Sequence, residues 1–217
     1  SIQLISRNGI HDLHQKYILP NKRDEYLNKW EEPTSENMKY LVHNYPQNNW
    51  NGMDYSRIVS IFEFKEYVEK YKIKPKKAAW FSGKGDPEES FIKCERVDHI
   101  TYEGDMGDLH TLNMIDKDYD FITLNQVIEH LYNPLVCLLN IYNHLKPGGY
   151  VYANLPALNI SHAEPFHFTS GLTPMGLLTL FIKSSNGLSV GLLASKSFRI
   201  LYINACGNIS LRASVPA

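Results

Sequence analysis

Histidines occur in two segments of the sequence that are each expected to follow a strand. The first segment, "LNQVIEHLYNP", places Asn125 and Gln126 at a strand end and His130 on the next turn. Histidine is the side chain best suited to take a proton near neutral pH. His130 is therefore either a catalytic base or a histidine that bonds the backbone at a helix start, and the sequence leaves both roles open.

The second segment, "SHAEPFHF", contains His162, Phe166 and His167, with Glu164 between the two histidines. Two histidines and a carboxylate raise the question of a metal ion. Their spacing, HxxxxH in a loop, is not one of the compact spacings typical of zinc ligands. We therefore expect no metal in this loop.

Two further segments carry groups that suit a cofactor. Gly83 and Gly85 in "SGKGDPEE" let the backbone turn tightly and approach a ligand, although an ordinary glycine turn explains them equally well. Glu103 and Asp105 in "YEGDMGDL" can accept hydrogen bonds from ribose hydroxyls or an exocyclic amine, and Met106 offers an apolar face to a base. Taken alone, this segment is more simply interpreted as a solvated turn.

Strands that alternate with helices position these four segments. Apolar residues at spacings of three and four predict a helix that starts near Asp54 and ends before Pro75. Asn133 and Pro134 predict the start of a second helix, and Thr173 that of a third. Strands are expected at residues 76–82, 99–105, 119–125 and 150–156, followed by a C-terminal hairpin that turns at residues 207–208.

This order of elements indicates an α/β fold with a mostly parallel sheet, an antiparallel C-terminal edge hairpin and an N-terminal helical extension. We expect the extension to span residues 1–72 and the sheet domain to span residues 73–217. Ligands of open parallel sheets bind beyond the carboxyl ends of the strands. All four segments are therefore expected to border one crevice.

The composition narrows the class of protein. With 22 Lys and Arg against 23 Asp and Glu among 217 residues, the net charge of -1 gives no electrostatic reason to expect nucleic acid. The three cysteines are far apart and outside any CxxC pattern, so neither a disulfide framework nor a zinc site is indicated. No apolar run reaches the roughly 18 to 20 residues of a membrane span. We expect a protein of the reducing cytoplasm.

Two longer stretches resemble a known family. "GDMGDL" is similar to the GDxxDLPF segment of the class I S-adenosylmethionine-dependent methyltransferases, in their small-molecule "type 11" branch. "DKDYDFITLNQVIEHLYNPLVCLLNIYNHLKPGGYVYANLP" resembles the long block of that family that ends in LKPGG and a strand. The resemblance implies a Rossmann-like sheet, S-adenosylmethionine as cofactor and a small-molecule methyl acceptor as partner. It leaves homodimer formation open.

The resemblance also implies roles for individual residues. His167 is the first and His130 the second candidate for a catalytic base toward a hydroxyl acceptor, whereas a carboxylate acceptor would need neither. The aromatic N-terminal region would act as a lid and substrate wall. The residues that would contact the substrate are His162, Phe166 and Trp50, and those that would contact the cofactor are Gly83, Gly85, Glu103, Asp105, Met106, Asn125 and Gln126.

The glycine loop departs from the family pattern. Phe81 occupies the position of the acid that precedes the first glycine, and Pro87 that of the third glycine. Only 20 positions separate Gly85 from Asp105, whereas a helix, strand, helix and strand need about 40 at typical element lengths. We therefore expect a shortened second βα unit. Asp98 and Glu103 compete for the role of the acid that binds the ribose.

Two rival functions follow from these departures. A non-catalytic scaffold or interaction protein that keeps the methyltransferase fold is favoured by Phe81 and by the shortened segment. A nicotinamide-dependent oxidoreductase is disfavoured, because the loop lacks the third glycine of GxGxxG. Methyl transfer from S-adenosylmethionine to an oxygen, nitrogen or carbon of a small molecule remains the predicted function.

Overall fold

A parallel five-stranded sheet is the centre of the computed structural model, which describes residues 10, 12, 35–50, 55–82, 84–101, 107–112, 116–156, 160–187 and 199–204. The strand order is β2-β1-β3-β4-β5, and each neighbouring pair is parallel. The strands are β1 (Lys77–Trp80), β2 (Arg96–His99), β3 (Tyr119–Asn125), β4 (Leu145–Leu155) and β5 (Arg199–Asn204). The α-helices are α3 (Ser35–Asn44), α4 (Tyr55–Lys70), α5 (Pro134–His144) and α6 (Pro174–Gly187), and the 3-10 helices are η2 (Pro87–Phe91) and η3 (Ile128–His130).

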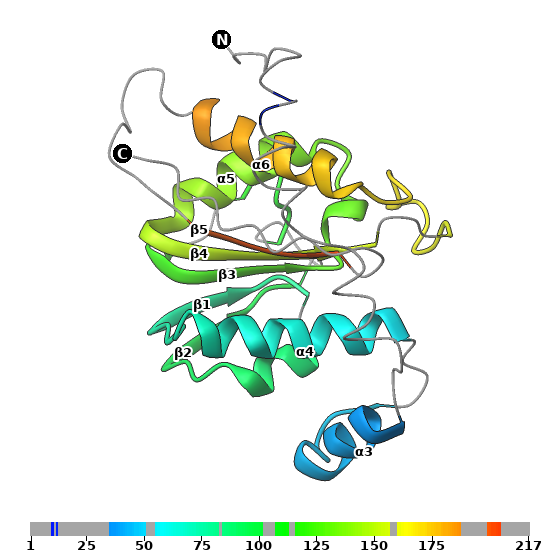
Figure 1. Cartoon of the computed structure of the whole chain (residues 1–217). Helices are drawn as coiled ribbons and strands as arrows, with labels where there is room; N and C mark the ends of the chain where they lie inside the picture. The colour runs from blue at the N-terminus through cyan, green and yellow to red at the C-terminus, as the bar shows by residue number, and fades with distance from the viewer. Residues whose placement is uncertain are drawn as a thin grey trace.

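Helices cover both faces of the sheet, with α4 on one face and α5 and α6 on the other (Figure 1). Successive residues of a strand point to opposite faces. Ala78 and Trp80 therefore pack in one cluster with Phe64 of α4, whereas Ala79 joins a second cluster with Leu138 of α5. This arrangement, with a buried parallel sheet between helices, confirms the predicted α/β fold.

Two of the predicted helix starts are present as capped helices. The Asn133 side chain accepts a hydrogen bond from the Val136 N–H at 3.4 Å, and α5 begins at Pro134. The Thr173 hydroxyl accepts one from the Gly176 N–H at 3.1 Å, at the start of α6. Each cap satisfies an N–H that has no partner within its own helix.

The second strand, β2, spans Arg96–His99. It therefore lies earlier in the chain than the predicted range of 99–105. The connection from β1 contains only the five-residue helix η2. Pairing therefore starts soon after η2, and the Arg96 N–H donates to the Lys76 carbonyl at 2.9 Å. The first crossover of the sheet is short, and it lacks the α-helix usual between parallel strands.

The C-terminal part of the sheet differs in detail from the prediction. β4 begins at Leu145 rather than near Tyr150, and an irregular stretch lies between these two residues where β4 pairs with β3. β5 forms within the region predicted for the first hairpin strand, and it pairs parallel to β4. The predicted turn at residues 207–208 and the strand after it lie outside the described residues.

The N-terminal region contributes helices α3 and α4. Leu41 of α3 is fully buried against Ile58 and Ile61 of α4, and Trp50 completes this cluster. A further predicted helix, "NKRDEYLNKW", lies outside the residues that the structure describes. None of the helices in the described ranges is both long enough and apolar enough to cross a membrane.

Candidate functional site

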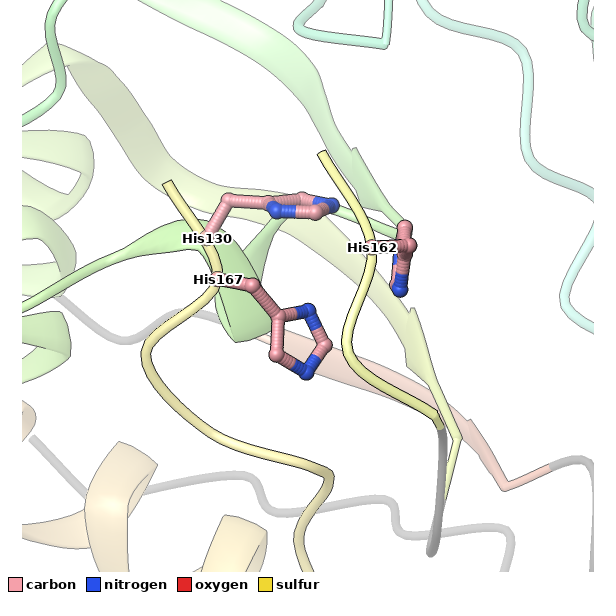
Figure 2. Close-up of side chains that lie close together, drawn as sticks. All are labelled: His130, His162 and His167. Carbon is pink, nitrogen blue, oxygen red and sulfur yellow. The ribbon is translucent and has the colours of Figure 1, made fainter. Parts of the chain in front are cut away.

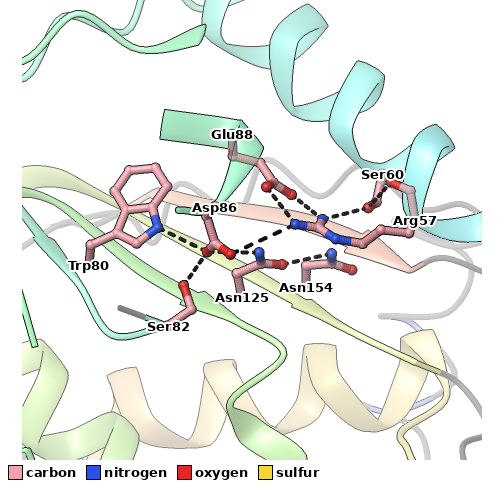
Figure 3. Close-up of polar contacts among 8 residues, drawn as sticks. All are labelled: Arg57, Ser60, Trp80, Ser82, Asp86, Glu88, Asn125 and Asn154. Carbon is pink, nitrogen blue, oxygen red and sulfur yellow. Dashed lines mark hydrogen bonds and ion pairs between the residues drawn. The ribbon is translucent and has the colours of Figure 1, made fainter. Parts of the chain in front are cut away.

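The loop after β1 and the end of β3 meet at the Asp86 side chain (Figure 3). Its carboxylate accepts hydrogen bonds from the Trp80 indole N–H and from the Asn125 amide, both at 3.0 Å. The Ser82 hydroxyl donates a third hydrogen bond to the same oxygen. The carboxylate is therefore held at the carboxyl edge of the sheet, where ligands of such folds bind.

Arg57 of α4 brings a guanidinium to the same place. It forms a bidentate ion pair with Glu88 of η2, in which the Nη2 to Oε2 distance is 2.6 Å. The Nη2 atom also lies 4.0 Å from an Asp86 carboxylate oxygen. The Glu88 side chain is fully buried, so the pair ties α4 to η2 with charge-assisted bonds.

Burial and pairing act in opposite directions on these two groups. Burial raises the pKa of the Glu88 carboxyl, and the positive charge of Arg57 and its hydrogen bonds oppose that rise. Burial alone would lower the pKa of the Arg57 guanidinium, but the negative charge of Glu88 outweighs it and holds this pKa above its usual range. Each charge therefore depends on the other to stay ionised away from water.

Asn154 extends the polar group across the sheet to β4. Its amide donates to the Asn125 Oδ1 atom at 2.9 Å. The Asn154 Oδ1 atom is buried and has no hydrogen-bond partner among the described residues. An acceptor without a partner at this depth can take a hydrogen bond from the donor of a bound ligand.

The structure places three of the predicted cofactor residues beside this group. Asn125 is part of it, and the Gln126 N–H donates to the Asn154 carbonyl at 2.7 Å. Gly85 has φ of +102°, and nothing lies within 4 Å of the position that a Cβ would take. The other predicted cofactor contacts lie outside the described residues: Gly83, Glu103, Asp105 and Met106.

Asp98, one of the two candidates for the ribose acid, already has partners. It accepts a hydrogen bond from the Tyr119 hydroxyl at 2.8 Å and pairs with Arg96 at 2.9 Å. Both partners belong to the sheet itself. Asp98 therefore has a structural role in the described part of the chain, and Glu103 remains a prediction.

Three histidines converge beyond β3 and β4 (Figure 2). His130 ends η3, and His162 and His167 lie on the loop that follows β4. Ring centroids are 5.0 Å apart for His130 and His162, 5.8 Å for His130 and His167, and 4.6 Å for His162 and His167. The structure thus brings together the histidines predicted as bases and the one predicted to contact substrate, while their roles stay predictions.

A buried carboxylate lies next to this histidine cluster. Glu129 is fully buried, and neither of its carboxylate oxygens has a hydrogen-bond partner among the described residues. Burial raises the pKa of this carboxyl, and charge on His130 or His162 would lower it. The Glu129 carbonyl accepts hydrogen bonds from the Phe168 and Thr169 N–H groups, which joins η3 to the histidine loop.

The two aromatic residues predicted to contact substrate lie in different surroundings. Trp50 is 7% exposed among the side chains of α3 and α4, and its indole N–H donates to the Tyr45 carbonyl at 2.9 Å. It therefore stabilises the packing of the N-terminal helices. Phe166 is 58% exposed on the histidine loop, where it is free to meet a ligand.

Comparison with known protein families identifies the class of protein. The family described as "Methyltransferase domain" matches residues 34–185, a range that includes the Asp86 group and the histidine cluster. The chain belongs to this methyltransferase family.

Individual relatives of this methyltransferase domain match more weakly. An uncharacterized methyltransferase of Schizosaccharomyces pombe is 30% identical over 63 residues, which are 29% of this chain and only 22% of that protein. A candidate methyltransferase of Bacillus halodurans is 15% identical, with a TM-score of 0.37 over 55% of this chain and 64% of that one. A SAM-dependent methyltransferase of Thermotoga maritima, a candidate histamine N-methyltransferase, is 14% identical, with a TM-score of 0.38 over 70% and 80% of the two chains.

Three charged residues of this methyltransferase domain were not predicted from the sequence: Arg57, Asp86 and Glu88. Phe81 occupies the position of the expected acid, and its side chain is buried in the core beside α5 and α6. Asp86, five residues later, supplies a carboxylate at the same edge of the sheet. The available signals were the "DPEE" after the glycines and Arg57, the one charged residue in the first half of α4 (55–62).

Proposed function

We propose that this methyltransferase domain uses S-adenosylmethionine to methylate an oxygen, nitrogen or carbon of a small molecule. The match to the methyltransferase family over residues 34–185 supports methyl transfer as the class of reaction. The Asp86 carboxylate lies beyond the carboxyl end of β1, beside Asn125 of β3. This position supports S-adenosylmethionine as the cofactor. When bound, this cofactor supplies a methyl group on a positively charged sulfur.

The residues present fit the amino acid end of this cofactor, which bears an ammonium and a carboxylate. Asp86 and the unpartnered Asn154 Oδ1 atom are acceptors suited to the ammonium. Arg57, whose Nη2 atom lies 4.0 Å from Asp86, is a donor suited to the carboxylate. Gly85 leaves open space beside the backbone of the loop.

Besides binding the cofactor, the protein must position the methyl acceptor and exclude water from the reacting atoms. In-line transfer of a methyl group is accelerated mainly by holding the reacting atoms at near-attack distance in the correct orientation. For a hydroxyl acceptor, His167 is the first choice of base and His130 the second in the metal-free protein, where the lone pairs of both rings are available for a proton. Phe166 would form the apolar wall for the acceptor.

Isothermal titration with S-adenosylhomocysteine, the demethylated product, tests the proposal. We expect saturable binding of one product molecule per chain, together with a rise in thermal stability. Absence of both heat and thermal shift at millimolar product would overturn the proposal and favour a non-catalytic scaffold. The titration does not require the acceptor to be known.

A further inference from the structure

The histidine cluster has the composition of a metal site. The nitrogen atoms that His130, His162 and His167 can offer as ligands all lie within 4.8 Å of one another. Figure 2 shows that the rings come from two separate segments and face a common space. We propose that these histidines bind one divalent transition-metal ion, with the buried Glu129 carboxylate compensating its charge.

Backbone carbonyls fix the tautomers that such a site needs. The Nδ1 atom of His130 lies 2.7 Å from the Phe166 carbonyl, and that of His162 lies 2.9 Å from the Ile160 carbonyl. Because a carbonyl only accepts hydrogen bonds, each Nδ1 must carry the proton. When such a ring is neutral, its lone pair is on Nε2, which is the arrangement that second-shell carbonyls impose on metal-binding histidines.

His167 lacks the hydrogen bonds that a histidine of a polar network would have. Both of its ring nitrogens are shielded from solvent, and neither has a partner among the described residues. A neutral imidazole in this position leaves one lone pair and one N–H unsatisfied. Coordination of a metal ion would satisfy the lone pair, which a purely structural role for this side chain leaves unexplained.

Glu129 supplies the second, independent observation. Its carboxylate is fully buried with neither oxygen hydrogen-bonded, directly before His130 in the chain. A buried carboxylate is costly unless a positive charge lies near it. Among the described residues no Lys or Arg forms an ion pair with it in the structure. A divalent cation held by the three rings would supply that charge.

The donor set indicates the class of metal. Three imidazoles with an open position suit Zn²⁺ and its neighbours in the first transition row, whereas Mg²⁺ and Ca²⁺ prefer oxygen ligands. Tetrahedral zinc with bonds near 2.05 Å needs ligand nitrogens about 3.3 Å apart. His162 is exposed on its loop, so a small movement of that loop would close the present spacing. The proposal does not depend on whether S-adenosylmethionine binds.

The test uses the full chain, prepared without a histidine tag and freed of metal by a chelator. Titration with Co²⁺ is expected to give a visible d–d absorption band that saturates at one ion per chain and disappears when Zn²⁺ displaces it. Mg²⁺ should not displace the band. No saturable band with Co²⁺, together with no competition by Zn²⁺, would overturn the proposal.

Variants locate the site. His162→Ala removes an exposed side chain and should abolish the band without loss of fold, whereas His43→Ala, at an exposed position of α3, should leave it unchanged. Glu129→Gln should keep the band but weaken the affinity by about 10 to 100-fold, as for outer-shell partners of metal ligands. An equal loss in the His162→Ala and His43→Ala proteins would contradict the assignment, as would full affinity in His162→Ala.

Discussion

Two groups of polar side chains lie beyond the carboxyl ends of the strands, and they differ in how their charges are paired. In the Asp86 group, Arg57 is bonded to Glu88 and lies near Asp86. In the histidine cluster, the Glu129 carboxylate has no hydrogen bond within the described structure. The first group pairs its charges within the protein, whereas the second holds a buried carboxyl group whose ionised form a cation would stabilise.

Glu88→Gln should show the largest effect, because it leaves the half-buried guanidinium of Arg57 without its bidentate partner. Removing one member of a buried ion pair typically costs several kcal/mol, and we expect a loss of roughly 3 kcal/mol in the free energy of unfolding. Urea denaturation measures it. The neighbouring Glu89→Gln is the matched control: Glu89 pairs with His99 at 2.8 Å near the surface and should cost less than about 1 kcal/mol.

Gly85→Ala tests the backbone conformation of the loop between β1 and η2 rather than a charge. A φ of +102° is strained for any residue with a Cβ, although no atom would clash with the new methyl group. We expect a loss of roughly 1 to 2 kcal/mol in thermal or urea unfolding. Gly176→Ala, inside α6, should instead be neutral or stabilising. Equal losses at both positions would show that the loop has a different conformation.

Glu129→Gln should have the opposite sign to Glu88→Gln. In the metal-free protein the substitution removes a buried carboxyl group that has no hydrogen-bond partner, and an amide is cheaper to bury than an ionised carboxylate. We expect a gain of roughly 1 kcal/mol at neutral pH, measured by urea unfolding in the presence of a chelator. A loss as large as that of Glu88→Gln would mean that Glu129 is already paired with a cationic group.

Local signals in the sequence were enough to predict much of the fold. Asn133 and Pro134 start α5 as expected, since a side-chain cap and a fixed proline φ act within a few residues. The position of β2 was predicted too late in the chain. Its start depends on how short the path from β1 is, and therefore on the formation of η2 in place of a helix, which no local pattern indicates.

The site was predictable only where its residues follow strands directly. Asn125 lies at the end of β3 as expected, and the three histidines lie in the predicted segments after strands, His130 in η3 and His162 and His167 in the loop after β4. Arg57 and Glu88 were not predicted, because they pair across 31 residues and each alone is typical of a solvated surface. The spacing of His162 and His167 alone does not indicate a metal site, because the third histidine, His130, comes from another segment of the chain.

The affinity for S-adenosylhomocysteine of the Asp86→Asn protein tests the central claim most directly. Asp86 would lose its charge but keep its shape, and a lost charge-assisted contact should weaken binding about 10 to 100-fold relative to the unaltered chain. Asp108→Asn, an exposed carboxylate bonded to His110, should leave the affinity unchanged. Unaltered binding by Asp86→Asn, or no binding by the unaltered chain, would contradict a cofactor site built on the Asp86 group.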